Sequence, residues 1–379
     1  MMKPARDFAL LLCALAPLLT SGCSASDAEP IYLGLAGPLE KPNGRSFRLA
    51  AEMAVEEINR AGGIRGRPLA LVVKDDEANS NRAIDVATEL RDNPGVVAVI
   101  GHVNSAQTLA AAKIYNDERN GVVAITPAST SPLIAAAGPW TFRVCPSELH
   151  HGAALARWIY GKLGRRRAGI LYANDGYGRG VHDSFIPAFV REGGEIVADD
   201  PYLPALYEDD RALDPYLERA IRNRMDALVI AGQSAEALKI LRAARRLGYT
   251  GPVFASEAAT DLKDAGPIAE GVYIPSAFVP DRHTTAAQQF VKAYIDRYRE
   301  LPDSRGAMAY DAVYLLKHVI EEVGTDRRKI RDRLAAIGRG APAYEGVTGT
   351  IAFDENGDAV GKEVTIGVVE NGRLVTARS

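Results

Sequence analysis

The chain has 379 residues, 47% of them apolar, and its 45 Lys+Arg and 48 Asp+Glu give a formal charge of −3. This length predicts two domains that each bury a core of their own. The near balance of charges excludes a nucleic-acid-binding protein, because such a protein needs a basic face for phosphate. The composition also excludes collagen-like, coiled-coil and disordered chains, which leaves a large soluble protein with α and β structure.

The N-terminus is typical of an export signal. Lys3 and Arg6 precede an apolar stretch over residues 8–19, which is too short to span a bilayer. The segment Leu19-Thr20-Ser21-Gly22-Cys23 follows and resembles the lipobox of bacterial lipoproteins.

We therefore expect residues 1–22 to be a signal peptide, Cys23 to be lipidated and residues 23–30 to form a linker. The alternative is cleavage after Ala28, which would release a protein without lipid. No later segment of the sequence reaches 18 apolar residues, so we expect the N-terminal lipid to be the only membrane attachment. Both alternatives place the protein outside the cytoplasm, in the periplasm or at the cell surface.

Short apolar runs then alternate with amphipathic segments, which predicts parallel sheets covered by helices. The strands expected first are 31–35, 69–74, 96–100, 122–125 and 142–144. The helices expected among them are 46–61, 81–91 and 105–117. A second series predicts strands at 168–172, 195–197, 227–230, 253–255 and 272–274. Its helices are expected at 150–163, 180–192, 213–222 and 234–247.

The end of the chain predicts helices at 285–298, 305–323 and 326–337, followed by strands at 349–353 and 364–370. Two doubly wound α/β lobes account for this order better than one large sheet. In such sheets, ligands lie beyond the carboxyl ends of the strands. The residues that follow each strand are therefore the candidates for a binding site.

Polar groups follow four of the expected strands. Ser105 begins a helix, where a hydroxyl and free backbone N–H groups can bind an anion. The loop 126–132 offers four hydroxyl groups between two prolines. Tyr177 lies in a glycine-containing loop, and Glu257 stands where it can meet a cation. Each feature alone is equally explained as a helix cap, a turn or a solvent-facing side chain.

In their order and spacing, these segments resemble the branched-chain amino-acid (leucine/isoleucine/valine-type) binding proteins of bacterial ABC importers. The segments that carry the resemblance are IYLGLAGPLE, AVEEINRAGGIRGRPL, VVKDDE, VIGHVNSAQT, ITPASTSP, FRVCPSE, NDGYGRG, FASEAAT and FDENGD. The resemblance implies two Rossmann-like lobes joined by three crossovers and closing on a ligand, the periplasmic binding protein type I fold. We expect residues 31–146 and 278–348 in lobe 1, and residues 147–277 and 349–379 in lobe 2.

The resemblance also implies roles for individual residues. Ser105 and Thr130 would hold the α-carboxylate of an amino acid. The Ala128 carbonyl and Glu257 would hold its α-ammonium group, and Tyr177 would cover the ligand when the lobes close. A zwitterion removed from water needs charged or hydrogen-bonding partners of both kinds, so this set is chemically coherent.

Two positions depart from the family pattern. Asn43 stands after the first strand, and Gln233 stands after the strand ending at Ile230, where family members often carry aromatic residues. Gln233 and Asn104 complete the ligand-binding residues that we expect. Without two aromatic walls, the ligand is either leucine-like, a more polar amino acid, or an amide.

Other motifs point to no chemistry. The acidic segment 354–358 starts like a calcium loop, but Ala359 replaces the sixth-position glycine and Thr365 replaces the twelfth-position glutamate. His102 and the pair His150-His151 lack metal-ligand spacing, and we expect them on the surface. Cys145 is expected to be a lone buried thiol. The sequence thus predicts no metal and no cofactor.

The function expected is that of a monomeric, exported solute-binding protein without catalytic activity. It would capture an amino acid or similar small polar solute and deliver it to ABC permease subunits. The alternative is a periplasmic sensing module that signals to a membrane partner. A hydrolase on the same fold would need a nucleophile and base pair, which the sequence does not offer.

Overall fold

The structure is a computed structural model that describes residues 29–203 and 211–378. The expected signal peptide and the lipidation site Cys23 lie outside these residues. None of the described helices is both long enough and apolar enough to cross a membrane.

Five parallel strands form the first sheet, in the order β2-β1-β3-β4-β5. Its strands are β1 (Ile31–Gly37), β2 (Leu69–Asp75), β3 (Val96–Ile100), β4 (Val123–Thr126) and β5 (Thr141–Arg143). The nearly unbroken apolar sequences of β1, β3 and β4 fit burial on both faces. One face packs on α1 (Pro42–Arg60), α9 (Ser304–Val323) and α10 (Arg327–Ala336), and the other on α2 (Ser80–Asp92) and α3 (Ser105–Tyr115).

Seven strands form the second sheet, in the order β14-β13-β10-β9-β8-β6-β7. Its strands are β6 (Arg167–Ala173), β7 (Glu195–Tyr202), β8 (Ala227–Ala231), β9 (Val253–Ala255), β10 (Tyr273–Ser276), β13 (Thr365–Glu370) and β14 (Arg373–Thr376). The helices α4 (Glu148–Arg157) and α5 (Gly176–Glu192) cover one face. The other face carries α6 (Asp214–Arg222), α7 (Ser234–Arg246) and the 3₁₀ segment η4 (Glu257–Ala269).

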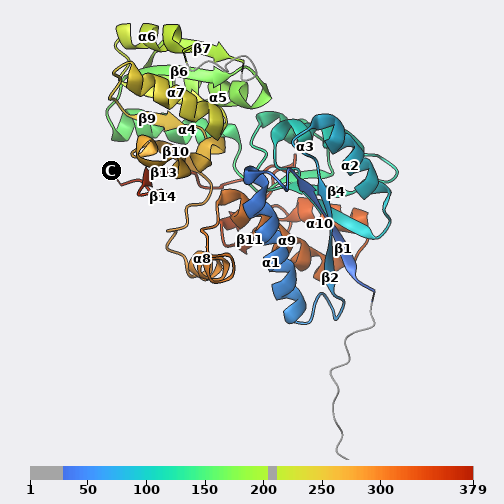
Figure 1. Ribbon diagram of the computed structural model, residues 1–379. Coiled ribbons are helices and arrows are strands. Elements are labelled where there is room, and N and C mark those ends of the chain that lie inside the picture. Colours follow the sequence, from blue (N-terminus) through green and yellow to red (C-terminus); the bar gives the residue numbers. More distant parts are fainter. Residues whose placement is uncertain (1–28, 204–210, 379) are drawn as a thin grey trace, which may run out of the picture.

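Both sheets wind in the same way. The order β7-β6-β8-β9-β10 repeats the order β2-β1-β3-β4-β5, and the pairings within each group are parallel. This order places a switch point between β1 and β3 and another between β6 and β8, where ligands bind in doubly wound folds. Figure 1 shows the two layered units, which meet near α3 and α5. The predicted fold class, two Rossmann-like doubly wound units, is confirmed.

The chain passes between the units three times. It leaves the first sheet after β5, returns after β10, and crosses again between β12 (Gly349–Ile351) and β13. The returning segment contains α8 (Thr285–Tyr298) and β11 (Tyr344–Gly346), and β11 pairs with β12 in a short hairpin. These connections are the three crossovers that the resemblance implied.

The helix after β1 starts earlier than expected. The sequence predicts its first residue at Ser46, whereas α1 begins at Pro42. Proline is favourable in the first turn of a helix, because its missing N–H has no intrahelical partner there. The earlier start brings Asn43 into the first turn of α1, at the carboxyl edge of the first sheet.

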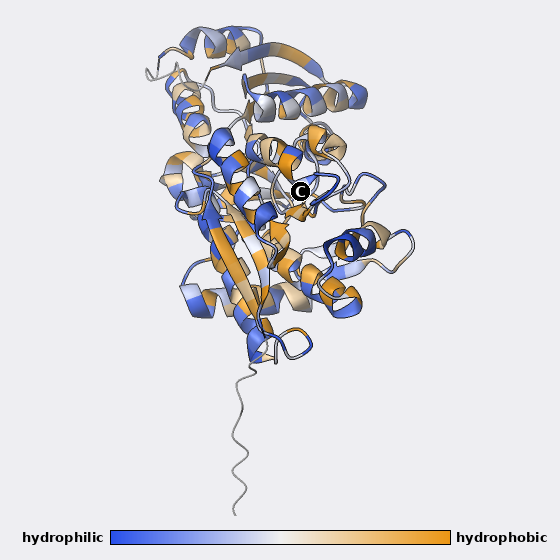
Figure 2. Cartoon of the chain, turned by 90° about the vertical axis from the view of Figure 1, so that its right-hand side faces the viewer, coloured by the Kyte–Doolittle hydropathy of each residue, from blue (hydrophilic) through white to orange (hydrophobic). Residues whose placement is uncertain are grey.

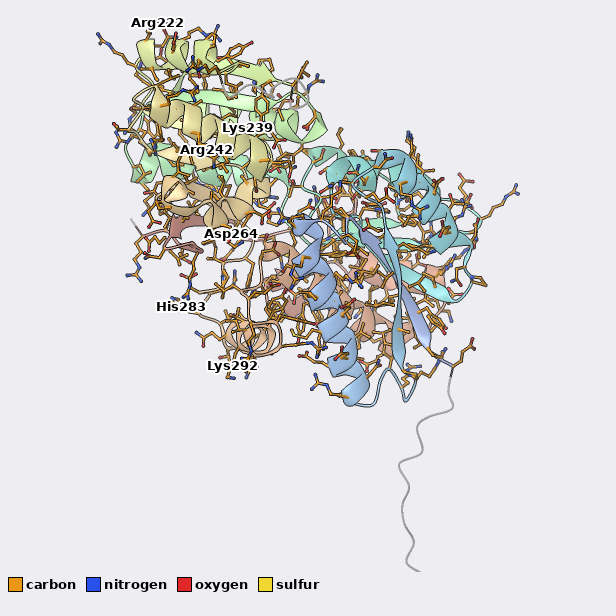
Figure 3. The ribbon with its side chains drawn as sticks, in the orientation of Figure 1. Arg222, Lys239, Arg242, Asp264, His283 and Lys292 are labelled. Atoms are coloured by element: carbon orange, nitrogen blue, oxygen red, sulfur yellow. The ribbon has the colours of Figure 1, made fainter. Side chains whose placement is uncertain are left out.

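Hydropathy follows the layered architecture. In Figure 2, apolar residues concentrate on the strands, and hydrophilic residues colour much of the helices. Figure 3 labels several charged side chains on outer surfaces, among them Arg222 on α6, Arg242 on α7 and Lys292 on α8. Cys145 is free and buried, as the sequence analysis predicted.

Candidate functional site

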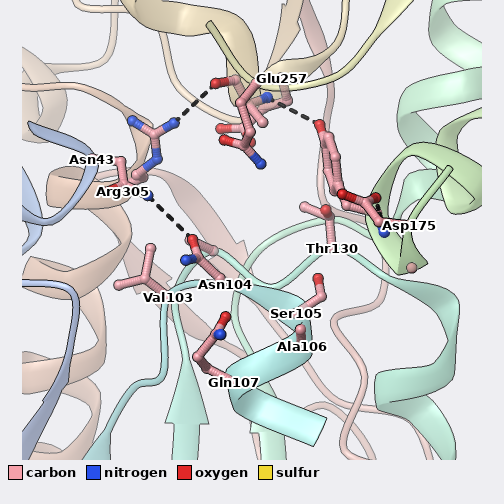
Figure 4. Close-up of a pocket in the computed structure, with 15 residues that line it drawn as sticks. Asn43, Val103, Asn104, Ser105, Ala106, Gln107, Thr130, Asp175, Glu257 and Arg305 are labelled. Carbon is pink, nitrogen blue, oxygen red and sulfur yellow. Dashed lines mark hydrogen bonds between the residues drawn. The ribbon is translucent and has the colours of Figure 1, made fainter. Parts of the chain in front are cut away.

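A cavity of about 220 Å³ lies between the two units, at the carboxyl ends of their strands. The residues that line it are Asn43, Val103, Asn104, Ser105, Ala106, Gln107, Ala128, Thr130, Asp175, Gly176, Tyr177, Gln233, Glu257, Ala258 and Arg305. All seven residues that the sequence analysis expected to bind a ligand are in this set (Figure 4). The structure therefore brings them together around one space, as the switch-point rule predicts.

The N-terminus of α3 forms one wall of the cavity. Asn104 is the last extended residue before the helix, and Ser105 is its first residue. The Ser105 Oγ accepts a hydrogen bond from the Ser131 backbone N–H at 3.2 Å, which joins the loops after β3 and β4. Backbone N–H groups in a first helical turn have no intrahelical partner, so this end of α3 favours a carboxylate.

A buried polar chain supports this wall from behind. Asp76 Oδ2 lies 2.6 Å from His102 Nδ1, and His102 Nε2 lies 3.2 Å from the Tyr115 hydroxyl. The His102 carbonyl accepts hydrogen bonds from the Thr126 and Ser129 hydroxyls at 2.7 and 3.3 Å. The expectation that His102 lies on the surface is wrong, because partners on both ring nitrogens offset the cost of burial.

Arg143 holds the loop after β4 in place. Its Nη1 donates to the carbonyl oxygens of Ser129 at 3.2 Å and Ser131 at 2.8 Å. Its Nε and Nη2 pair with both carboxylate oxygens of Asp358 at 2.5 and 2.6 Å. The acidic segment 354–358, which fails as a calcium loop, thus supplies an internal partner for a fully buried arginine.

The start of α5 forms the facing wall. The Asp175 Oδ1 accepts hydrogen bonds from the backbone N–H groups of Tyr177 at 2.9 Å and Gly178 at 2.8 Å, which fixes the first turn. The Tyr177 hydroxyl accepts from the Ala258 N–H at 3.0 Å. Burial raises the pKa of Tyr177 well above its usual value, so the hydroxyl stays protonated and retains its proton for donation.

Glu257 is a buried carboxyl group that faces the cavity from the first turn of η4. Only 7% of the residue is exposed, and the Ser304 hydroxyl donates to its Oε1 at 2.7 Å. Burial raises the pKa of Glu257, while the nearby charge of Arg305 and the Ser304 hydrogen bond oppose that rise. A carboxylate in this position favours an ammonium group in the cavity.

Arg305 lines the cavity although the sequence analysis did not expect it. Its Nη1 lies 3.0 Å from Asp303 Oδ2 and 3.9 Å from Asp261 Oδ1, and its Nη2 donates to the Ala258 carbonyl at 3.5 Å. Burial by itself lowers the pKa of Arg305, but the surrounding carboxylates, including Glu257, raise it by more, so the guanidinium stays charged.

One sequence signal predicts the start of the helix that carries Arg305. Asp303 caps α9 by accepting from the Gly306 N–H at 2.9 Å, and an Asp before a helical pattern marks a helix start.

In the sequence, Asn43 stands out only as a departure from the family pattern. Its Nδ2 donates to Asn104 Oδ1 at 3.2 Å, so the two side chains meet at the cavity.

Two buried titratable side chains lie behind Thr130. The Glu148 backbone N–H donates to the Thr130 carbonyl at 2.8 Å, and Glu148 Oε2 lies 4.0 Å from His151 Nδ1. Burial raises the pKa of Glu148 to about 8 and lowers that of His151 to about 3, which leaves both groups mainly neutral at pH 7. The surface position expected for His151 is therefore wrong, whereas the neighbouring His150 is exposed.

Within residues 29–203 and 211–378, no three His, Cys, Asp or Glu side chains come together in a way that could hold a metal ion. The chemistry of the cavity is thus that of hydroxyl, amide, carboxylate and guanidinium groups. Such groups suit the binding of a small polar molecule.

Comparison with known proteins gives a consistent result over nearly the whole chain. Residues 31–373 match the family described as periplasmic binding protein. A relative from Pseudomonas aeruginosa, described as a leucine-, isoleucine-, valine-, threonine- and alanine-binding protein, is 31% identical over 353 residues. That alignment covers 89% of this chain and 90% of the relative.

Two solved structures are similar in sequence and fold. An ABC transporter substrate-binding protein of Desulfitobacterium hafniense in complex with Leu has a TM-score of 0.81 and 32% identity, covering 92% of this chain and 100% of its own. A leucine-binding protein of Thermotoga maritima has a TM-score of 0.81 and 30% identity, covering 92% and 98%. With its two doubly wound units and the cavity between them, the chain belongs to the periplasmic binding protein family.

Proposed function

We propose that the protein binds an amino acid or similar small polar solute between its two units and delivers it to an ABC importer. One observation carries the proposal: Ser105 at the N-terminus of α3, Thr130 and the buried carboxyl group of Glu257 line the same cavity. An α-amino acid carries both complementary charges a short distance apart. The relatives described as amino-acid-binding proteins and ABC transporter substrate-binding proteins support this function.

In this proposal each wall holds one part of the amino acid. The Ser105 hydroxyl, Thr130 and the first turn of α3 bind the α-carboxylate. The Ala128 carbonyl and Glu257 bind the α-ammonium group. These contacts replace the hydration that the zwitterion loses, and charged hydrogen bonds of this kind are stronger than neutral ones.

The two units would act as lobes that close on the ligand. We assign the first sheet and its helices to lobe 1 and the second sheet and its helices to lobe 2. Ile351 and Phe353 pack in the core of the first sheet, so we place the third crossover after Phe353. Tyr177 then belongs to lobe 2 and covers the ligand, while Gln233 and Asn104 contribute amide groups from opposite lobes.

The proposed partner is the permease of an ABC importer. The similar structure described as an ABC transporter substrate-binding protein favours this partner over the sensing module that signals to a membrane protein. We propose that the protein acts as a monomer and without catalysis, as a carrier whose binding energy is used only to select and hold its ligand.

We also propose that the protein is exported and anchored through lipid on Cys23. The support is the short apolar stretch before Cys23 and the resemblance of residues 19–23 to a lipobox. Mass spectrometry of the mature N-terminus tests the anchor. A diacylated or triacylated Cys23 is expected, whereas an unmodified N-terminus at Glu29 would contradict the proposal.

A thermal-shift screen against amino acids and their analogues tests the proposed function. At 100 times its dissociation constant, a ligand adds about 2.7 kcal/mol to the free energy of unfolding. For domains of 150–250 residues this corresponds to a rise of roughly 5–11 °C in the unfolding midpoint. At least one α-amino acid is expected to give such a rise.

Matched analogues make the screen specific. The decarboxylated amine and the deaminated acid of the best ligand should each give almost no shift, because each lacks one of the two charged groups. The proposal fails if no amino acid raises the midpoint, or if the deaminated acid raises it as much as the amino acid does.

A further inference from the structure

The polar lining of the cavity bears on which amino acid it accepts. Resting on the proposed function, we propose that the ligand's side chain is short and uncharged and ends in a hydroxyl or amide group. The relatives described as leucine-binding proteins do not decide this point, because it depends on the side chains that line the cavity of this chain.

Four of the polar side chains that line the cavity come from four different parts of the chain. Asn43 comes from α1, Asn104 from the residue before α3, Gln233 from the residue before α7 and Arg305 from α9. Figure 4 shows Asn43 and Arg305 on the side of the cavity that lies away from Thr130. A ligand whose carboxylate binds near Thr130 therefore extends its side chain toward amide and guanidinium groups.

Apolar surface is scarce at this end. Val103 is the one branched aliphatic residue among the described residues that line the cavity, and Tyr177 supplies the one aromatic ring. Pockets for apolar groups are lined mainly by apolar side chains. A leucine side chain would displace water from Asn43 and Gln233 without replacing its hydrogen bonds, which lowers affinity.

After their hydrogen bonds within the protein, these polar groups retain N–H donors that can bind a ligand. Asn43 Nδ2 donates to Asn104 Oδ1, which orients both amides and leaves the Asn104 amide nitrogen to donate elsewhere. Arg305 donates to Asp303 and to the Ala258 carbonyl, and a guanidinium has five N–H groups in all. A hydroxyl or amide oxygen on the ligand can accept from these donors.

The charges around Arg305 favour a neutral side chain. Asp303 and Asp261 lie 3.0 and 3.9 Å from its guanidinium and balance its charge, and Glu257 adds another carboxylate nearby. An acidic side chain would meet this excess of carboxylates. A basic side chain would lie against the guanidinium of Arg305 itself, so both charged classes are disfavoured.

Calorimetry with isosteric pairs of amino acids tests the inference. Threonine and valine have the same shape and differ by a hydroxyl group, and asparagine and leucine are similarly matched. The purified protein is first freed of retained ligand by unfolding and refolding. Threonine is expected to bind at least about tenfold tighter than valine, or asparagine at least about tenfold tighter than leucine, because a site that hydrogen-bonds a polar group rejects its apolar analogue. Aspartate should bind at least about tenfold more weakly than asparagine.

A double variant tests the residues named. Asn43→Leu with Gln233→Met should reduce the ratio of the affinities of the polar ligand and its apolar isostere at least about tenfold. Glycine has no side chain, so its affinity should change by less than about threefold if the variant leaves the α-group contacts intact. Gln289→Met, on the exposed side of α8, is the matched control and should change neither quantity.

The outcomes separate this inference from the proposed function. If valine and leucine bind as tightly as their polar partners, or tighter, the inference is overturned and the proposed function stands. If none of these amino acids binds, the inference is overturned, and the thermal-shift screen against the remaining amino acids decides the proposed function. An unchanged preference in the double variant would contradict the assignment of Asn43 and Gln233.

Discussion

Replacing Glu257 by glutamine should weaken amino-acid binding by roughly 30-fold to 1,000-fold or more. Glu257 is buried and held by the Ser304 hydroxyl, so its carboxylate is already oriented when the ligand arrives. Removing one charge from a buried, hydrogen-bonded ion pair costs about 2–5 kcal/mol of binding free energy. Isothermal titration calorimetry with the best ligand from the thermal-shift screen measures the loss.

The free energy of unfolding of the Glu257→Gln variant should rise or stay constant, although its ligand affinity falls. Burial raises the pKa of Glu257, which means that the folded protein pays to keep this carboxylate ionised, and glutamine removes that cost. Asp264→Asn is the matched control, because Asp264 lies on the same segment η4 but is exposed. Equal ligand affinity in the Glu257→Gln variant and the wild type would exclude Glu257 from the ammonium site.

Replacing Arg143 by methionine should lower the free energy of unfolding by about 3–5 kcal/mol. Arg143 is completely buried and makes a bidentate ion pair with Asp358, and removing one partner of such a pair leaves an uncompensated charge. The variant also removes the Arg143 donor from the carbonyl oxygens of Ser129 and Ser131. Urea denaturation of the ligand-free protein measures the change.

Two further variants identify the cause of that loss. Arg222→Met removes an exposed arginine paired with Glu218 on α6, and it should cost less than about 1 kcal/mol. Arg143→Met combined with Asp358→Leu should recover part of the stability, because an apolar pair leaves no buried charge unpaired. If the double variant is less stable than the Arg143→Met variant, the ion pair is not the source of the loss.

The sequence predicts the layered architecture well, because central strands such as β3 and β8 are continuous apolar runs. The bounds of β3 (Val96–Ile100), β9 (Val253–Ala255) and α8 (Thr285–Tyr298) are those expected. The candidate site follows from the same logic, since the residues after parallel strands gather at one edge of a sheet. The resemblance to a family supplied the roles of individual residues, which the strand pattern by itself leaves open.

Other parts of the site depend on contacts between distant segments. Arg305 reaches the cavity from a helix that packs on α1, and no local pattern near position 305 shows that Glu257 will be its neighbour. The burial of His102 is equally hidden, because it depends on Asp76 and Tyr115 being at the right distance. Polar residues of this kind look like surface residues until their partners are known.

The hydrogen bond between Ser304 and Glu257 affects how well the ligand-free and ligand-bound forms of the carrier can be told apart by the importer. It joins a helix of the first unit directly to a segment of the second. One such bond contributes about 0.5–1.5 kcal/mol, which changes a closing equilibrium by roughly 2- to 13-fold. A complete switch from 1:99 to 99:1 needs about 10⁴-fold. This bond can therefore orient the Glu257 carboxylate before the ligand binds. It is too weak to keep the ligand-free protein in a closed form that the importer would recognise as ligand-bound.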